Sequence, residues 1–365
     1  MNPYQSLPAK AFWRSAIAER PLLGIGNLWA PKFNITPTDN IVTAGSCFAQ
    51  HISRSLLAHG YTWLDAEPAP PMLSAEQKRN FGFGVFSFRT GNIYTTAMLR
   101  QWLSWALEKT EPPAEAWVTD GRVYDPFRPN VEPNGFSSTA EMLASRENTL
   151  AAIRAAVKQA SVFVFTLGLT EAWINSNNGA VYPMCPGTVA GTFDPSSHEF
   201  KNYSYNEVLS DLQAAVNLMR KANEQLRVLL TVSPVPLTAT ASDDHVLVAT
   251  TYSKSTLRAV AGDLARELAF VDYFPSYEII ATFPFRGIFF GPNMRSVGQE
   301  GVDFVMKSFF RALNDQKAPA EPSRSQARPA APAIDSHWAA SAKAQRALEE
   351  TQCEEELLAA FGDTK

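Results

Sequence analysis

A short apolar run that ends in a glycine and leads directly into two nucleophilic side chains constrains this chain most. The run covers 41–45, Ser46 and Cys47 follow, and residues 48–57 have the pattern of a helix. This order predicts a strand, a tight turn and a helix. Backbone N–H groups and the positive end of the helix dipole would then lie beside both side chains. Such a position lowers the pKa of a thiol and favours its thiolate, so we expect the rest of the chain to serve as a scaffold for this turn.

Four apolar runs of strand length alternate with helical patterns along the chain. They cover 41–45, 161–167, 227–232 and 269–273. The continuous apolarity of 161–167 is typical of a central strand that is covered on both faces. Strands that alternate with helices indicate parallel crossovers. We therefore predict an α/β fold with a mostly parallel central sheet, in which 41–45 lies in the interior.

The remaining patterns predict further elements around this sheet. A hairpin is expected at 117–124, where Asp120-Gly121 forms the turn, and a loop at 174–203. Apolar periodicity and capping residues predict helices at 48–59, 92–108, 140–159, 204–222, 250–267 and 296–313.

Composition divides the chain into four segments. Residues 1–40 are rich in proline and aromatic residues and are expected to form an irregular arm. The α/β domain is expected to cover 41–315. Residues 316–335 are rich in Pro, Ala, Ser and Arg, which predicts a flexible linker, and 336–365 have the propensity of a helical tail.

Charge and cysteine content exclude several classes of protein. The chain has 365 residues, 45% of them hydrophobic, so it can bury a full core. Its net charge of −4 and the lack of a basic stripe argue against nucleic acid as a partner. Three cysteines are too few for a disulfide framework, and no CxxC or clustered His/Cys pattern supports a metal site. We expect neither a metal nor another cofactor.

The sequence predicts a cytoplasmic protein without a membrane span. Its first twenty residues lack the apolar core of a signal peptide. The longest apolar runs, 162–169 and 228–232, have the length of strands. The oligomeric state is left open.

Polar or glycine-rich residues follow three of the predicted strands, at 45–47, 168–171 and 233–236. In open α/β sheets, ligands bind at the carboxyl ends of the strands, so these residues are candidates for a site. A Gly-Ser pair after a strand is common, however. Ser46 could simply cap the helix, and Cys47 could be a small buried hydrophobic residue.

The pentapeptide Gly45-Ser46-Cys47-Phe48-Ala49 resembles the signature of the GSCFA domain family. Further pieces resemble the same family in the same order, and the resemblance covers roughly 40–313; the pieces are 80–86, 165–168, 232–235, 253–258 and 273–278. The resemblance implies membership of the SGNH/GDSL-like hydrolase superfamily. It also implies a three-layer α/β/α sandwich.

The first two blocks of that superfamily can be carried over to this sequence. The first block, Gly-Asp-Ser with an attacking serine, places Cys47 at the nucleophile, so Cys47 is the first candidate and Ser46 the second. The second block supplies a glycine N–H to the oxyanion hole, a role that the resemblance gives to Gly82 or Gly84.

The later blocks depart from the superfamily. Gly-x-Asn is replaced by Gly168-Leu169-Thr170, which leaves Thr170 and the following Glu171 as candidates for holding the oxyanion or the substrate. Asp-x-x-His is replaced by 293–296, Asn-Met-Arg-Ser, so both the acid and the base are missing. Arg295 could bind an anionic group of the substrate.

Two histidines are candidates for the missing base. His198 follows the strand at 161–167, and His245 follows the strand at 227–232, each within a segment that could fold back over the site. Both could equally be ordinary loop histidines.

Two hypotheses of function follow from these residues. The first is an acyl-ester hydrolase or O-acyltransferase that acts on a carbohydrate or a small ester. The second is a catalytically inactive domain of the same fold that binds a glycan or a partner protein in an aromatic groove; Phe81, Phe83, Phe86 and Trp173 are available for it.

Overall fold

The computed structural model of the chain describes residues 2–315 and 354–362. The described residues form two compact units, one of residues 2–34 and 279–315 and the other of residues 35–278 and 354–362. The predicted linker 316–335 and most of the predicted tail 336–365 lie outside the described residues. Within the described ranges, no helix has both the length and the apolar character needed to cross a lipid bilayer.

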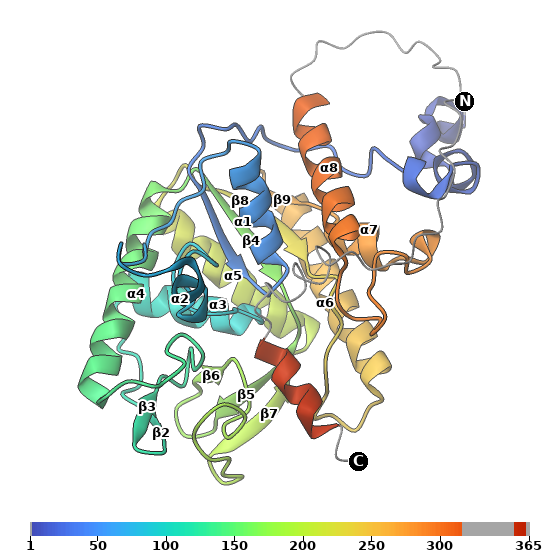
Figure 1. Ribbon diagram of the computed structural model, residues 1–365. Helices are drawn as coiled ribbons and strands as arrows, with labels where there is room; N and C mark the ends of the chain where they lie inside the picture. Colours follow the sequence, from blue (N-terminus) through green and yellow to red (C-terminus); the bar gives the residue numbers. More distant parts are fainter. Residues whose placement is uncertain (1, 316–353, 363–365) are drawn as a thin grey trace. The chain divides into compact units, whose positions relative to one another are not determined.

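A four-stranded parallel sheet forms the centre of the larger unit (Figure 1). Its strands, in spatial order, are β1 (Ile41–Gly45), β4 (Val162–Leu167), β8 (Arg227–Val232) and β9 (Val271–Tyr273). All three pairings are parallel. The predicted parallel sheet is therefore confirmed, strand by strand.

The predicted interior position of β1 is wrong, because β1 is the edge strand of this sheet. Its outer side is covered by irregular chain rather than by a long strand. Ile41 forms a single parallel bridge with Trp63, the Ser87 N–H donates to the Thr43 carbonyl, and the Ile93 N–H donates to the Gly45 carbonyl. Continuous apolarity indicates that both faces of a strand are buried. It gives no information on whether the strand has a neighbour on one side or on both sides.

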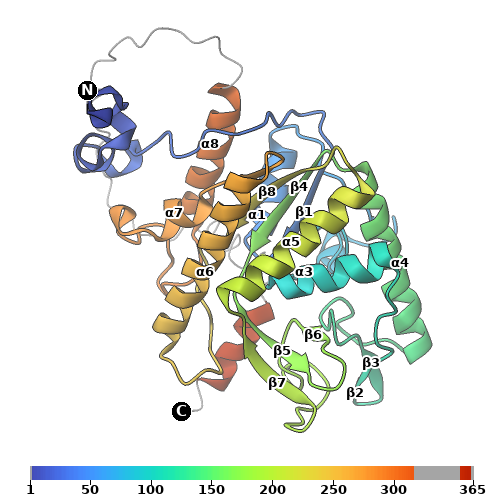
Figure 2. The same cartoon turned by 180° about the vertical axis from the view of Figure 1, so that it is seen from behind.

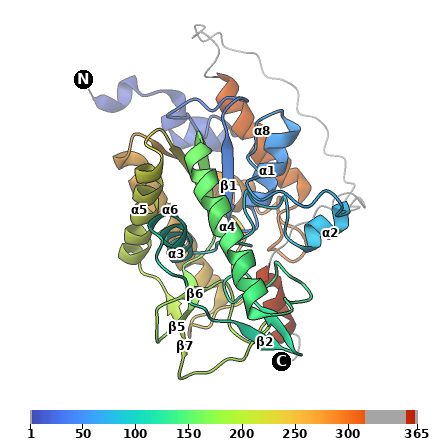
Figure 3. The ribbon, with the colours of Figure 1, turned by 90° about the vertical axis from the view of Figure 1, so that its left-hand side faces the viewer.

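Helices cover both faces of the sheet and make three layers (Figures 2 and 3). One face is covered by α3 (Thr96–Leu103), η5 (Ser104–Glu108), α4 (Thr139–Gln159), α5 (Tyr205–Ala222) and α6 (Val246–Glu267). On the other face, α1 (Ala49–Ala58) packs against β1.

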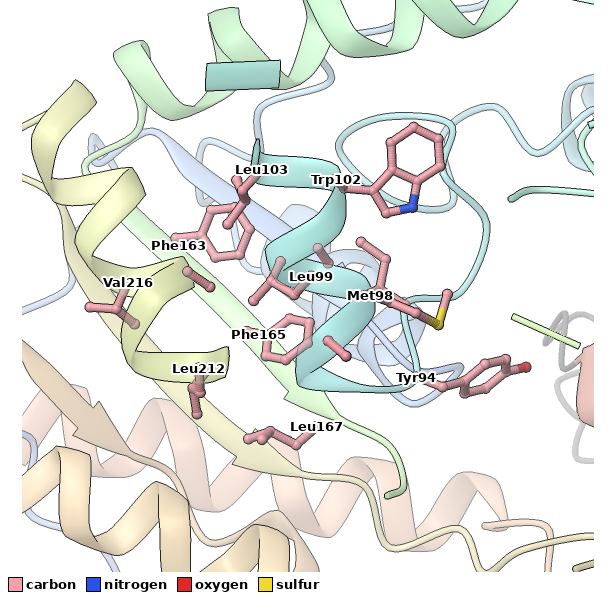
Figure 4. Packing of buried hydrophobic residues seen from close by; sticks show 14 of the residues in the cluster. Tyr94, Met98, Leu99, Trp102, Leu103, Phe163, Phe165, Leu167, Leu212 and Val216 are labelled. Atoms are coloured by element: carbon pink, nitrogen blue, oxygen red, sulfur yellow. The ribbon is translucent and has the colours of Figure 1, made fainter. Parts of the chain in front are cut away.

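The main core lies between β4 and the helices of the first face (Figure 4). Phe163, Phe165 and Leu167 of β4 point toward Leu99 of α3 and Leu212 of α5. All five side chains are at most 1% exposed. This core fixes β4, and with it the position of the residues that follow β4.

A second, antiparallel sheet replaces the loop that was predicted at 174–203. It consists of β5 (Glu171–Asn175) between β6 (Val181–Tyr182) and β7 (His198–Asn202). The remaining elements of this unit are α2 (Ala75–Asn80), η7 (Glu354–Phe361) and the predicted hairpin, which is confirmed as β2 (Trp117–Thr119) and β3 (Arg122–Tyr124). The helix α7 (Ser276–Ala281) ends in the smaller unit.

The smaller unit combines the N-terminal arm with the last long helix. Its arm has only short turns, at η1 (Pro3–Ser6), η2 (Ala9–Ala11), η3 (Arg14–Ala18) and η4 (Leu22–Gly24). The later elements are η6 (Phe283–Phe285) and α8 (Gln299–Asp315). Trp13 stacks on Phe283 and Trp29 stacks on Phe309, so aromatic residues of the arm are anchored to the C-terminal part of the same unit.

Candidate functional site

The strand, the turn and the helix that the sequence predicts around Ser46 and Cys47 are present. Ser46 and Cys47 separate β1 from α1 and are buried, with 2% and 4% of their surfaces exposed. Ser46 does not cap the helix through its side chain, since Phe48 occupies the N-cap position without a side-chain hydrogen bond. Among the described residues, the Ser46 Oγ atom has no hydrogen-bond partner. A buried hydroxyl without a structural partner calls for another explanation.

Two glycines allow the ends of β1 and β4 to meet at this turn. Gly45 has a φ of +131°, and a Cβ atom there would lie 2.4 Å from the Thr166 carbonyl oxygen. A Cβ atom on Gly168 would lie 2.9 Å from the Tyr94 carbonyl oxygen and 3.1 Å from the Ser46 Cβ. Real Cβ atoms essentially never lie within 3.0 Å of a backbone oxygen, so the two carbonyl contacts require glycine at both positions.

The helix α6 braces the turn that follows β4. The Lys254 ammonium is buried and donates to the Gly168 carbonyl over 2.5 Å. The Ser253 Oγ accepts a hydrogen bond of 2.9 Å from the Thr170 N–H. These contacts give a structural role to the Ser253-Lys254 pair, which sequence reasoning placed in the family pattern without a role.

The polar groups of Thr170 and Glu171 are engaged by neighbouring segments. The Thr170 hydroxyl donates to the Asn202 Oδ1 over 2.7 Å, and one carboxylate oxygen of Glu171 accepts from the Thr240 hydroxyl over 2.8 Å. A role for Thr170 at an oxyanion stays a prediction, and it requires the hydroxyl to exchange its Asn202 partner.

The glycine loop after α2 packs against the start of α1. Val85 and Phe86 form a small buried cluster with Ala49. Gly82 donates its N–H to the Arg79 carbonyl, whereas the Gly84 N–H donates to no group in the described part of the chain. Of the two glycines, Gly84 is therefore the better candidate for an oxyanion donor.

Arg89 fixes the conformation of this loop. Its Nε donates to the Phe81 carbonyl over 2.9 Å, and its guanidinium lies over the Phe83 ring, 3.9 Å from the ring centroid. The Arg89 N–H donates to Glu67, whose carboxylate also accepts from the Thr149 hydroxyl on α4. The loop is thus tied to the helical layer through polar contacts.

The same contacts continue into a buried ionic cluster. The Asp125 carboxylate pairs with Arg128 over 2.9 Å and with Arg146 over 2.8 Å, and all three side chains are at most 1% exposed. Arg128 donates in turn to Thr149 over 2.6 Å. Burial alone would raise the pKa of Asp125, but the two guanidinium groups hold it below its ordinary value.

Neither candidate base is arranged as a general base. The Nδ1 atom of His198 accepts a hydrogen bond from the Asp194 N–H, and the Nδ1 atom of His245 accepts one from the Leu247 N–H at the start of α6. A neutral imidazole that accepts at Nδ1 carries its proton on Nε2, so Nε2 cannot take a proton from a nucleophile. The proposed role of either histidine stays a prediction that requires a different tautomer.

His51 is partly withdrawn from solvent. Its ring centroid lies 5.5 Å from that of Phe48, one turn after Cys47. Burial, and then the charge of Arg54, lower the pKa of His51 to about 4. The ring is therefore neutral at pH 7.

We expect His51 to make stability depend on pH. Its folded-state pKa of about 4 lies below the ordinary value of 6.5, so the unfolded chain binds the extra proton. Stability is then full above pH 6.5 and falls as the pH drops from 6.5 to 4, by about 1–2 kcal/mol after allowance for partial exposure. Urea unfolding of the wild type and His51→Gln at several pH values isolates this contribution. Equal pH slopes in both proteins would contradict it.

Arg295, the candidate anion-binding residue, belongs to the smaller unit. Its N–H and that of Ser296 donate to the Asn293 side-chain oxygen, and the Asn293 amide donates to the Ser296 hydroxyl. The segment at 293–296 therefore forms a turn closed by its own hydrogen bonds.

An apolar cavity of about 490 Å³ lies at the carboxyl ends of β4 and β8 in the larger unit. Tyr94 and Leu169 form the wall nearest to Gly168, while Ser46 and Cys47 are not part of its lining. Trp173, one of the aromatic residues expected in a binding groove, also lines it. Burial raises the pKa of the Cys185 thiol in the wall to about 11, so this thiol is protonated at pH 7.

The described residues contain no group of three His, Cys, Asp or Glu side chains that could hold a metal ion. No curated protein and no solved structure matches the chain. The sequence model of the GSCFA family matches residues 40–309, which is most of the chain and includes the turn at Ser46 and Cys47. The chain therefore belongs to the GSCFA family.

Proposed function

We propose that this protein is an acyl-ester hydrolase or O-acyltransferase of the SGNH/GDSL type. The observation that carries the proposal is the pair of nucleophilic side chains after β1, Cys47 and Ser46, of which the buried Ser46 hydroxyl has no hydrogen-bond partner among the described residues. Ser46 directly follows the carboxyl end of β1, and α/β proteins bind ligands at the carboxyl ends of their parallel strands. The family match includes this pair.

In the proposed reaction, the Cys47 sulfur attacks the ester carbonyl and forms a thioester, and the alcohol leaves with a proton. Water or a second hydroxyl then attacks the thioester and restores the thiol. A thiol is intrinsically a stronger nucleophile than a hydroxyl, so a cysteine nucleophile needs the missing histidine less than a serine would. The Gly84 N–H is the proposed donor to the oxyanion.

Trapping of the acyl-enzyme tests this proposal and identifies the nucleophile. The wild type, Cys47→Ala and Ser46→Ala are incubated with p-nitrophenyl butyrate, and adducts are mapped by mass spectrometry. We expect Cys47→Ala to lose the adduct and at least about 10³-fold in turnover. Cys353→Ala, which removes a thiol outside the described residues, is the matched control and should keep both.

Other outcomes are equally informative. Loss of the adduct in Ser46→Ala alone would assign the attack to the hydroxyl. An adduct that survives in both variants would contradict the proposal.

A catalytically inactive binding domain is the second candidate. The tautomers of His198 and His245 favour it, because both Nδ1 atoms already accept backbone N–H groups. An absence of turnover in the wild type, together with saturable binding of an oligosaccharide, would support this candidate instead.

A further inference from the structure

The cavity at the carboxyl ends of β4 and β8 has the chemistry of a site for an aliphatic chain. Its wall is mainly apolar and aromatic, formed by Leu169, Trp173, Met184, Phe193, Phe200 and Leu237. Its volume of about 490 Å³ is within the range of small-molecule sites. Among the described lining residues, Glu171 is the only acidic one, and none is Lys, Arg or His.

This charge pattern selects the class of ligand. A free carboxylate or a phosphate would meet the Glu171 carboxylate without a compensating cation in the wall. A sugar carries hydroxyls around its whole ring and would leave many of them without partners in an apolar wall. A neutral alkyl chain needs no polar partner and gains free energy from the burial of each methylene.

The position of the cavity relates it to the proposed nucleophile. Leu169, in its wall, directly follows Gly168, and the Cβ position of Gly168 is 3.1 Å from the Ser46 Cβ. Tyr94, also in the wall, accepts hydrogen bonds from the N–H groups of both Gly168 and Leu169. The turn at Gly168 and Leu169 therefore lies between the cavity wall and Ser46 at the end of β1.

We propose that this cavity binds the aliphatic acyl chain of the substrate, so that the enzyme prefers esters of medium-chain acids. This inference rests on the proposed function for the identity of the ligand as an ester. The cavity itself can be tested without catalysis, because a ketone of the same shape cannot be hydrolysed.

The experiment measures binding of methyl alkyl ketones of increasing length, from 2-butanone to 2-decanone, by isothermal titration calorimetry. Each added methylene should tighten binding about fourfold until the cavity is full. Ala239 lies in the lining and is exposed, so Ala239→Trp should fill the mouth and weaken 2-decanone binding at least tenfold. Ala151→Trp, at an exposed position on α4 away from the lining, is the matched control and should bind like the wild type.

A second variant enlarges the cavity. Leu237→Ala removes apolar volume from the wall and should shift the longest favourable chain upward by one or more methylenes. Affinities that do not change with chain length, or that are the same in Ala239→Trp and the wild type, would overturn the inference.

Turnover separates this inference from the proposed function. Chain-length-dependent ketone binding without hydrolysis of any p-nitrophenyl ester would support the cavity and contradict the proposed function. Hydrolysis of esters at Cys47 with no dependence on acyl length in binding or turnover would do the reverse.

Discussion

Replacing Asp125 with alanine should lower the free energy of unfolding by about 3–5 kcal/mol, since it leaves two buried guanidinium groups without their anion. Arg128 and Arg146 both pair with this carboxylate, and no side chain of the three is more than 1% exposed. Urea denaturation at pH 7 measures the effect. The loss in Asp125→Asn should be similar, because an amide keeps the shape and removes the charge.

An exposed ion pair on α4, the helix that carries Arg146, provides the control. Glu147 and Arg154 form a pair whose side chains are 63% and 29% exposed, so Glu147→Ala should cost about 0.5 kcal/mol or less. The stabilisation that Asp125 provides should also disappear as the pH falls through the lowered pKa of this carboxyl group, because only the ionised carboxylate pairs with the two guanidinium groups. Equal losses of unfolding free energy in Asp125→Ala and Glu147→Ala would show that the buried cluster stabilises the fold no more than an exposed ion pair does.

Replacing Gly45 with alanine should destabilise the protein by about 3 kcal/mol or more. The new Cβ would lie 2.4 Å from the Thr166 carbonyl oxygen, and the φ of +131° is one that L-residues rarely adopt. Strain of the backbone and overpacking each contribute about 1–3 kcal/mol. Because Thr166 belongs to β4, relief of the clash would pull β1 away from the strand with which it pairs.

A second glycine separates the two contributions. Gly121, in the turn between β2 and β3, has a φ of +71° and open space where a Cβ would lie. Gly121→Ala should therefore cost only about 1–2 kcal/mol, the backbone contribution alone. Similar thermal and urea midpoints for the two variants would mean that the close approach at Gly45 relaxes without cost.

Local patterns were sufficient to predict the regular elements of the core. The strands at 41–45, 161–167, 227–232 and 269–273 and their parallel pairing agree with the structure, because apolar continuity and helical periodicity are read directly from neighbouring residues. The edge position of β1 was not predictable in this way, since it depends on hydrogen bonds from Ser87 and Ile93 that no local pattern encodes.

The antiparallel sheet was missed for a different reason. The strands β5, β6 and β7 are only two to five residues long and mix apolar with polar residues. Asn177-Asn178-Gly179 lies between β5 and β6, within the segment 174–203 that the sequence predicts to be a loop. Short strands of this kind are stabilised mainly by cross-strand partners such as Trp173 and Phe200.

Sequence reasoning located the turn at Ser46 and Cys47 but not the buried contacts elsewhere in the larger unit. The close approach of Gly168, the buried Lys254 and the ionic cluster around Asp125 all join residues that are far apart in the chain. The residue types alone do not reveal these buried contacts, because a lysine or an arginine in a helical pattern is usually solvent-exposed. The tautomers of His198 and His245 were equally invisible, since they depend on which backbone N–H each ring meets.

The pairing of β1 with β4 has a consequence for the synthesis of the protein. Ile41 lies opposite Val162, so the ribosome must add 121 residues (162 − 41) after the first position of β1 before its partner exists. At 5–20 residues per second, this interval is about 6–24 s. An apolar strand that carries the candidate nucleophile at its end waits throughout that time without its partner strand. Slower translation would therefore prolong the period in which this segment is open to aggregation or to capture by chaperones.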